Sequence, residues 1–422
     1  LKKLLEQDEL FKLGMNGEQA AITFGLFAAE TLTAADGTQI PADGLIEILS
    51  LGEDCSAICQ TDLPFGSFYL KELSTDCHYR LNGEIFPFTF DYAGASVPVV
   101  EIQVNEGNAI ENTLIRGEIH GMKTDENGNG LAGAVIGLFR EGETEFTEKT
   151  ALLTAISTEG GSFYFEGVPF GNWQLKELQG VTGFVFSDEV ISVSIGEDGA
   201  VVEIDFENQR IYGNLRLTKV DKDFPDNTLS GAEFEVYRDS NENKELDESD
   251  ELLGVMEETS PGVYEMLHVE YGGVFVKESK APAAFQLDEN AYYVEVAENG
   301  KTYEVETEAG KGFINAAQTG NLYIKKTSDD NVLQGFTFKV EGTDATGRQF
   351  YKEYVTDEKG EIHIELRVGE YTISELSNEA TEKYILPDAA TVTVEADSTA
   401  SVEFHNKLKP TPPPTDSPQT GD

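Results

Sequence analysis

The stretch NWQLKE (residues 172–177) alternates large apolar and polar side chains, which is the two-residue period of a β-strand. Trp173, Leu175 and Glu177 then share one face, and the two large apolar side chains predict that this face is buried. A buried carboxylate without a partner is costly, so Glu177 is expected to have a partner inside the fold. The same pattern recurs as FYLKE ending at Glu72, VFVKE ending at Glu278 and YTISE ending at Glu375.

Two further strand patterns accompany these glutamates in a fixed order. A strand carrying an inward-facing lysine comes before the glutamate, at Lys123 in GEIHGMKTD, Lys219 in GNLRLTKVD and Lys326 in GNLYIKKTS. A closing strand carrying an asparagine comes after it, at Asn112 in AIEN, Asn208 in IDFEN, Asn315 in GFIN and Asn406 in VEFHN. In the first unit we expect Lys12, in ELFKLG, to take the lysine position, although Asp8 stands where an apolar residue belongs.

The repeated order predicts four units of about a hundred residues, a size that suits antiparallel β-sandwiches. Alternating strands with Gly, Asp and Asn turns between them favour an all-β fold throughout. The short connections predict an elongated, stiff rod, and the Pro-rich end predicts an extended spacer. The expected ranges are 1–115, 116–211, 212–319 and 320–409 for the domains and 410–422 for the spacer.

The composition excludes several classes of partner. The chain has 30 Lys and Arg against 78 Asp and Glu, a net charge of −48, so its surface repels nucleic acid and anionic lipid. No apolar run is long enough to span a bilayer, and the first residues lack the features of a signal peptide, so we expect a mature or truncated piece of a longer protein. The three cysteines, Cys55, Cys59 and Cys77, all lie in the first quarter, which excludes a disulfide framework elsewhere.

A buried lysine, glutamate and asparagine allow two interpretations. The first is a buried ion pair with a hydrogen-bonded amide, but such a pair is at best weakly stabilising, and its repetition with an inward asparagine is hard to explain by packing. The second is chemical, because burial favours the neutral amine of lysine and the neutral acid of glutamate. A neutral amine can attack the amide carbon, release ammonia and leave an isopeptide bond, with the glutamate moving protons.

The ordered set LRLTKVD, WQLKE or YTISE, and DFENQ or EFHNK resembles the Cna B-type and SpaA-like pilin domains of Gram-positive surface proteins. The resemblance covers nearly the whole chain and implies tandem Greek-key, prealbumin-like sandwiches with spontaneous Lys–Asn bonds between the first and last strands. Such bonds would carry tension past the hydrogen-bond ladder and brace cysteine-free domains. By position, the implied triads are Lys123/Glu177/Asn208, Lys219/Glu278/Asn315, Lys326/Glu375/Asn406 and, in the atypical first unit, Lys12/Glu72/Asn112.

The end of the chain, SPQTG, resembles the LPxTG motif that sortases cleave. The resemblance implies cleavage after the threonine and its linkage to an amine of peptidoglycan or of another pilin subunit, although a serine replaces the usual leucine. The residues concerned are Ser417, Pro418, Gln419, Thr420 and Gly421.

Two stretches have some features of metal sites, and no cofactor is expected. The loop DSNENKELDESD spaces oxygen side chains as an EF-hand-type calcium loop does, at Asp239, Asn241, Asn243, Glu245, Asp247 and Asp250. Lys244 sits where the turn glycine belongs, so an acidic hairpin loop is favoured over calcium binding. Cys55, Cys59, Cys77 and His78 have poor spacing for zinc, and free thiols or one disulfide are favoured.

These patterns predict an extracellular, cell-wall-anchored structural or adhesive protein, or an accessory pilin, rather than an enzyme with turnover. The lysine motif YPK of pilus shaft subunits does not occur in the chain, which favours an anchoring or accessory role. Two other interpretations remain open. The chain is the non-catalytic stalk of a surface enzyme such as a glycosidase, or it is an adhesin whose first domain (1–115) binds a host or matrix ligand.

Overall fold

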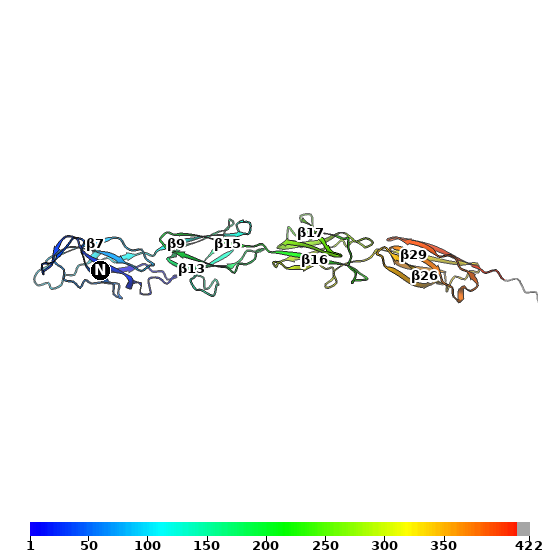
Figure 1. Ribbon diagram of the computed structural model, residues 1–422, viewed down its shortest axis with the longest axis horizontal. Helices are drawn as coiled ribbons and strands as arrows, with labels where there is room; N and C mark the ends of the chain where they lie inside the picture. Colours follow the sequence, from blue (N-terminus) through cyan, green and yellow to red (C-terminus); the bar gives the residue numbers. More distant parts are fainter. Residues whose placement is uncertain (412–422) are drawn as a thin grey trace, which may run out of the picture. The chain divides into compact units, whose positions relative to one another are not determined.

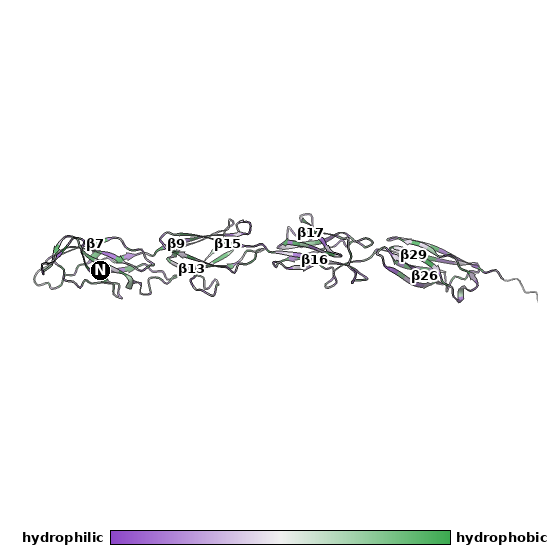
Figure 2. Ribbon diagram, in the orientation of Figure 1, coloured by the Kyte–Doolittle hydropathy of each residue, from purple (hydrophilic) through white to green (hydrophobic). Residues whose placement is uncertain are grey.

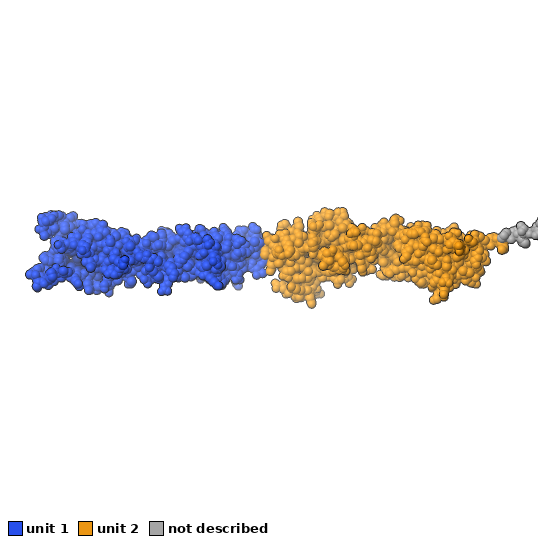
Figure 3. All heavy atoms as spheres, turned by 90° about the horizontal axis from the view of Figure 1, so that it is seen from below, with its two compact units in different colours: residues 1–210 blue, residues 211–422 orange. Residues whose placement is uncertain are grey.

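The computed structural model describes residues 1–411, and the fold is built almost entirely of β-strands (Figure 1). The described residues contain three short 3-10 helices and no α-helix, which confirms the all-β prediction. Within the same residues, no helix has the length and apolar character needed to cross a membrane. The chain divides into two compact units, Leu1–Arg210 and the part that begins at Ile211 (Figure 3).

The first unit contains two hydrophobic cores, and we call the strands around them the first and second sandwiches. The first sandwich has β1 (Lys3–Leu5), η1 (Glu18–Ala21), β2 (Thr23–Ala28), β3 (Leu32–Thr33), β4 (Gln39–Ile40), β5 (Leu45–Ser50), β6 (Gly66–Ser74), β7 (Ile85–Phe90), η2 (Val104–Gly107) and β8 (Ile110–Asn112). The second has β9 (Arg116–Asp125), β10 (Val135–Arg140), β11 (Leu153–Ile156), β12 (Ser162–Pro169), β13 (Gly171–Gln179), β14 (Val190–Ile195) and β15 (Val201–Asn208).

The second unit also contains two cores, which define the third and fourth sandwiches. The third has β16 (Tyr212–Asp221), β17 (Glu233–Arg238), β18 (Glu251–Val255), β19 (Glu257–Ser260), β20 (Val263–Glu270), β21 (Gly272–Lys280), β22 (Ala291–Val296), β23 (Thr302–Glu304) and β24 (Phe313–Asn315). The fourth has β25 (Thr319–Ser328), β26 (Thr337–Asp344), β27 (Gln349–Val355), β28 (Glu361–Arg367), β29 (Gly369–Glu375), η3 (Glu379–Thr381), β30 (Tyr384–Ile385), β31 (Ala390–Val394) and β32 (Thr399–Leu408).

Each sandwich packs two sheets against each other. The strand that carries the glutamate lies inside a four-stranded sheet, and the orders are β5-β2-β6-β7, β11-β10-β13-β14, β18-β17-β21-β22 and β27-β26-β29-β31. The opposite sheet holds the first and last strands of the sandwich as parallel neighbours, in the pairs β1–β8, β9–β15, β16–β24 and β25–β32. The first and last strands therefore lie side by side, facing the strand that carries the glutamate.

The strands carry both apolar and hydrophilic residues (Figure 2), and burial alternates along β13 with a period of two. In β13, Trp173, Leu175 and Glu177 are buried, whereas Gln174 and Lys176 are only partly buried. The period of two therefore predicted the buried face of this strand correctly.

Within the first unit, the segment after β1 leaves the first core and joins the second. Phe11 is buried in the second core, where its ring meets the ring of Trp173 edge-on at 5.0 Å. Beside it, the guanidinium of Arg116 donates to Glu6 at 3.1 Å and to Asp8 at 2.8 Å. The two sandwiches of this unit thus share apolar and charged contacts.

Within the second unit, Arg367 of β28 reaches the end of β16. Its guanidinium donates to both carboxylate oxygens of Asp221, at 2.7 and 2.8 Å, and to Asp223 at 2.6 Å. Asp221 is buried, and the paired charge lowers the pKa of its carboxyl against the opposing effect of burial. The strand that carries Lys219 therefore also anchors the fourth sandwich.

Candidate isopeptide sites

The second sandwich brings together the three residues predicted for it. Lys123 comes from β9, Glu177 from β13 and Asn208 from β15, and all three side chains are buried. Lys123 Nζ lies 3.6 Å from Glu177 Oε1, and Asn208 Nδ2 donates to both carboxylate oxygens at 3.0 and 3.1 Å. Among the described residues, Lys123 Nζ and Asn208 Oδ1 have no hydrogen-bond partner, so the amine and the amide oxygen are not engaged elsewhere.

The third sandwich holds the same arrangement with shorter contacts. Lys219 Nζ lies 3.0 Å from Glu278 Oε1 and also donates a hydrogen bond to Asn315 Oδ1. Asn315 Nδ2 donates to both oxygens of Glu278 at 2.9 Å. The amide of Asn315 is therefore held between the amine through its oxygen and the carboxyl group through its nitrogen.

The fourth sandwich gathers its residues more loosely. Lys326 Nζ lies 3.8 Å from Glu375 Oε2 and donates to the carbonyl oxygen of Thr327 at 2.6 Å. Asn406 Nδ2 donates to Glu375 Oε1 at 2.7 Å, while Glu375 Oε2 and Asn406 Oδ1 have no hydrogen-bond partner in the part of the chain that the structure describes.

The first sandwich corrects the lysine that the sequence analysis placed there. Lys12 is exposed, with a positive φ of 60°, in the turn that packs Phe11 into the second core. Lys3 of β1 takes the position instead, with Nζ 2.5 Å from Asn112 Oδ1 and 3.3 Å from Glu72 Oε1. Asn112 Nδ2 completes the cluster with a hydrogen bond to Glu72 Oε1 at 2.9 Å.

All four clusters share one register between the parallel strands. The lysine lies opposite the residue two positions before the asparagine, in the pairs Lys3–Ile110, Lys123–Phe206, Lys219–Phe313 and Lys326–Phe404. Because side chains alternate, this offset puts the lysine and the asparagine on the same inward face. The shared register explains why the lysine and the asparagine meet in every core.

Burial lowers the pKa of each lysine, although the neighbouring glutamate acts in the opposite direction. The pKa of Lys219 falls to about 8, and the pKa values of Lys3, Lys123 and Lys326 lie below the ordinary lysine value. Burial also raises the pKa of Glu375. Aromatic rings supply much of this dry environment, since Lys219 Nζ lies 4.3 Å from the ring centroid of Phe313. A neutral amine, the form that acts as a nucleophile, is thus more accessible here than in water.

The sequence analysis missed Lys3 and one backbone group. The alternation Leu1, Lys3, Leu5 was the available signal for Lys3, but β1 is only three residues long. A backbone N–H ten residues after the glutamate also reaches the carboxylate in three sandwiches, from Asn82, Ser187 and Asp288. Each of these residues is short and polar, a pattern visible in the sequence only once the contact is known.

The acidic loop at residues 239–250 satisfies its own carboxylates. Asp239 accepts the backbone N–H groups of Asn243 and Lys244, and Asp250 accepts those of Ser240 and Asp247. Hydrogen bonds from neighbouring side chains lower the pKa of Asp247 to about 2. Among the described residues, no three acidic ligand atoms of this loop lie within 4.8 Å of one another.

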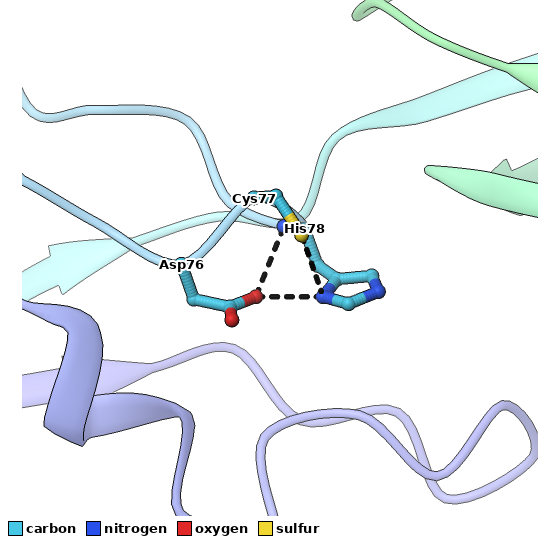
Figure 4. A group of neighbouring side chains, drawn as sticks. All are labelled: Asp76, Cys77 and His78. Carbon is cyan, nitrogen blue, oxygen red and sulfur yellow. Dashed lines mark hydrogen bonds and ion pairs between the residues drawn. The ribbon is translucent and has the colours of Figure 1, made fainter.

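The cysteines do not form the zinc set considered from the sequence. Among residues 1–411, one group of three residues has potential metal-ligand atoms that all lie within 4.8 Å of one another. The group consists of Asp76, Cys77 and His78 (Figure 4). Asp76 Oδ1 lies 2.6 Å from His78 Nδ1 and accepts the backbone N–H of His78 at 3.0 Å, which is the pattern of a tight turn. Cys55 and Cys59 are free and lie outside this group, and burial raises the pKa of the Cys59 thiol to about 11.

The sorting motif at residues 417–421 lies outside the described residues.

Comparison with known proteins identifies the family. The sequence profile of the SpaA prealbumin-like fold domain matches residues 117–210, 213–311 and 320–408. The chain therefore belongs to the family of SpaA-type prealbumin-like domains, which confirms the predicted tandem sandwiches. No curated protein sequence matches the chain.

One solved structure has the same fold at low sequence identity, and two pilin structures match with lower TM-scores. The Bacillus anthracis TIE protein is 17% identical, with 96% of this chain and 74% of that chain covered and a TM-score of 0.58. The major pilin subunit BcpA of Bacillus cereus is 15% identical, with 70% of this chain and 100% of that chain covered and a TM-score of 0.36. A streptococcal ancillary pilin is 16% identical, with coverage of 70% and 100% and a TM-score of 0.28.

Proposed function

We propose that the chain is a pilin-like, non-enzymatic surface protein of a Gram-positive cell whose sandwiches are braced by self-formed Lys–Asn isopeptide bonds. The observation that carries the proposal is the recurrence of one buried cluster, with one strand register, in all four sandwiches. Structural ion pairs have no need for an asparagine whose amide nitrogen always meets the carboxyl group. A repeated reaction site requires that arrangement.

The contacts support a balanced reaction in the third sandwich. The neutral Lys219 Nζ attacks Asn315 Cγ, the new Nζ–Cγ bond forms, and the Cγ–Nδ2 bond breaks. Glu278 takes a proton from Nζ and delivers one to Nδ2, which leaves as ammonia, so the carboxyl group ends as it began. The oxygens of Glu278 lie 2.9 Å from Nδ2, which places the proton donor at the leaving atom. The folded sandwich supplies the high effective concentration that the uncatalysed reaction lacks.

Intact-mass measurement of the full chain tests the proposal. Each bond removes one ammonia, so a fully linked chain is lighter than its sequence by four ammonia molecules. Peptide mapping after proteolysis then assigns the links to Lys3–Asn112, Lys123–Asn208, Lys219–Asn315 and Lys326–Asn406. A mass equal to that of the unmodified sequence would falsify the proposed chemistry.

Anchoring is proposed from the sequence alone. A sortase would cleave between Thr420 and Gly421 and join Thr420 to an amine of peptidoglycan or of another pilin subunit. The test is incubation with sortase and a small amine nucleophile, followed by mass measurement of the product. Thr420→Ala should abolish the product, and a product of unchanged yield would refute this site.

One observation favours a second role, ligand binding by the first sandwich. A cleft of about 600 Å³ opens there, with Phe88 and Phe90 among its lining residues. Phe65 is exposed next to it, with its ring 5.1 Å from that of Phe90. A binding screen of the full chain against glycans and matrix proteins tests this role. Binding that persists unchanged in Phe65→Ala and Phe90→Ala would place the ligand elsewhere.

A further inference from the structure

A turn after the glutamate strand contacts the buried carboxylate in three of the four sandwiches. The backbone N–H ten residues beyond the glutamate donates to its Oε2 atom. The donors are Asn82 to Glu72 at 2.7 Å, Ser187 to Glu177 at 3.1 Å and Asp288 to Glu278 at 2.8 Å. The common spacing and the common acceptor atom indicate one repeated structural element, which we call the turn amide.

The side chain of the same residue fixes the turn that presents this amide. It accepts the backbone N–H two residues later, from Glu84 to Asn82 at 2.9 Å, from Glu189 to Ser187 at 3.3 Å and from Asn290 to Asp288 at 3.0 Å. Short Asn, Ser and Asp side chains make this local bond readily, which explains why these residue types recur at the position.

The fourth sandwich has no turn amide on its glutamate. The residue ten positions beyond Glu375 is Ile385, which belongs to β30 and pairs with Lys407 of β32. Glu375 Oε2 has no hydrogen-bond partner among residues 1–411, and its distance of 3.8 Å from Lys326 Nζ is the longest lysine–glutamate contact of the four clusters. The cluster that lacks the amide is therefore also the one whose carboxylate is held least firmly.

We propose that the turn amide is a positioning group for the cross-linking reaction, an inference that rests on the proposed function. By holding Oε2, it fixes the rotation of the carboxyl group so that the oxygens face the asparagine nitrogen that must receive a proton. A glutamate has three rotatable side-chain bonds, and misplacement of a reacting group by about 1 Å lowers a rate on the order of a hundredfold. The fourth sandwich is consequently expected to cross-link most slowly.

The test removes one turn amide and leaves the other sandwiches as internal controls. Ser187→Pro deletes the N–H that Glu177 accepts, and Ser187→Ala keeps that N–H while deleting the hydroxyl group. Full chains are made by cell-free synthesis and sampled over time, and each of the four linked peptides is quantified by mass spectrometry. Trp173, the only tryptophan of the chain, lies in the same sandwich, so its fluorescence reports separately whether that sandwich has folded.

In Ser187→Pro, we expect the Lys123–Asn208 link to form roughly tenfold or more slowly, with unchanged Trp173 fluorescence and unchanged rates in the other sandwiches. Ser187→Ala keeps the N–H but loses the hydroxyl that holds the turn, so its rate should lie between those of the parent and Ser187→Pro. A Ser187→Ala rate as low as that of Ser187→Pro overturns the role of the amide itself. A parent rate in Ser187→Pro overturns the proposal. Equal rates in the third and fourth sandwiches of the parent chain also overturn it, and this comparison needs no variant. A parent chain without any link refutes the proposed function itself.

Discussion

Replacing Glu278 by glutamine isolates the chemical role of the carboxyl group in the third sandwich. The substitution keeps the size of the side chain and its ability to accept a hydrogen bond from Asn315, but glutamine cannot take and deliver protons. We expect the chain to fold with Lys219 and Asn315 unlinked. After correction for the substitution, its mass should exceed that of the parent by one ammonia.

The magnitude of the stability loss follows from the loop that the bond closes. Lys219 and Asn315 are 96 residues apart in the sequence. By the loop-closure estimate used for disulfides, a cross-link over that distance is worth about 4–5 kcal/mol of unfolding free energy. Loss of the Glu278 charge adds little to this decrease in unfolding free energy. The pKa of Lys219 is already lowered to about 8, so the amine can become neutral instead of remaining an unpaired buried charge.

Urea unfolding followed by hydrogen exchange measures this loss in the third sandwich alone. Glu257→Gln, an exposed position on β19, is the matched control, and it should leave both the mass deficit and the stability at parent values. The reasoning fails if Glu278→Gln still loses the ammonia of this site. It also fails if the link is absent while the unfolding free energy of the third sandwich is unchanged.

Three further predictions concern groups around the sites. In Asn315→Ala, Lys219 stays a free amine, and its pKa in the folded chain is about 8. Above that pH the unfolded chain binds more protons than the folded chain. The unfolding free energy should therefore rise by about 3 kcal/mol between about pH 8 and 10.5. The linked parent has no titrating amine there, and the same rise in the parent contradicts the link. Phe11→Ala should destabilise the second sandwich by about 3–5 kcal/mol, seen in urea titrations by tryptophan fluorescence, and a loss below about 1 kcal/mol refutes its place in that core. Arg367→Met leaves the buried Asp221 unpaired and should cost about 3–5 kcal/mol in urea unfolding, and an unchanged midpoint would show that the pair contributes nothing.

Strand parity made most of the fold and three clusters predictable. In β16, Leu215 and Leu217 fix the inward face two residues at a time, and Lys219 follows on that face with no freedom to point elsewhere. In such a run, each apolar residue confirms the inward face assigned to the residue two positions before it. The repetition of the pattern in other strands then supplied the order of lysine, glutamate and asparagine.

The parts that failed lacked such a run or depended on tertiary contacts. β1 has one residue on either side of Leu4, so alternation alone could not distinguish Lys3 from other lysines near the start. Lys12 lies beside Phe11, whose burial in the second core is decided by packing between two sandwiches and not by any local period. The turn amides are contacts of backbone groups across ten residues, for which side-chain patterns give no direct signal.

The parallel pairing of the first and last strands explains what a link would do under load. Tension applied at the start of β16 and beyond Asn315 pulls these parallel neighbours in opposite directions, so their hydrogen bonds are loaded in shear. A covalent bond between Lys219 and Asn315 would pass the load directly, so that residues 220–314 would carry none of it. β16 meets β23 and β24 over three residue pairs each, whereas β25 meets β32 over eight pairs in one continuous run. The third sandwich therefore has the shorter and interrupted ladder beside its site, and it would gain more from a bond.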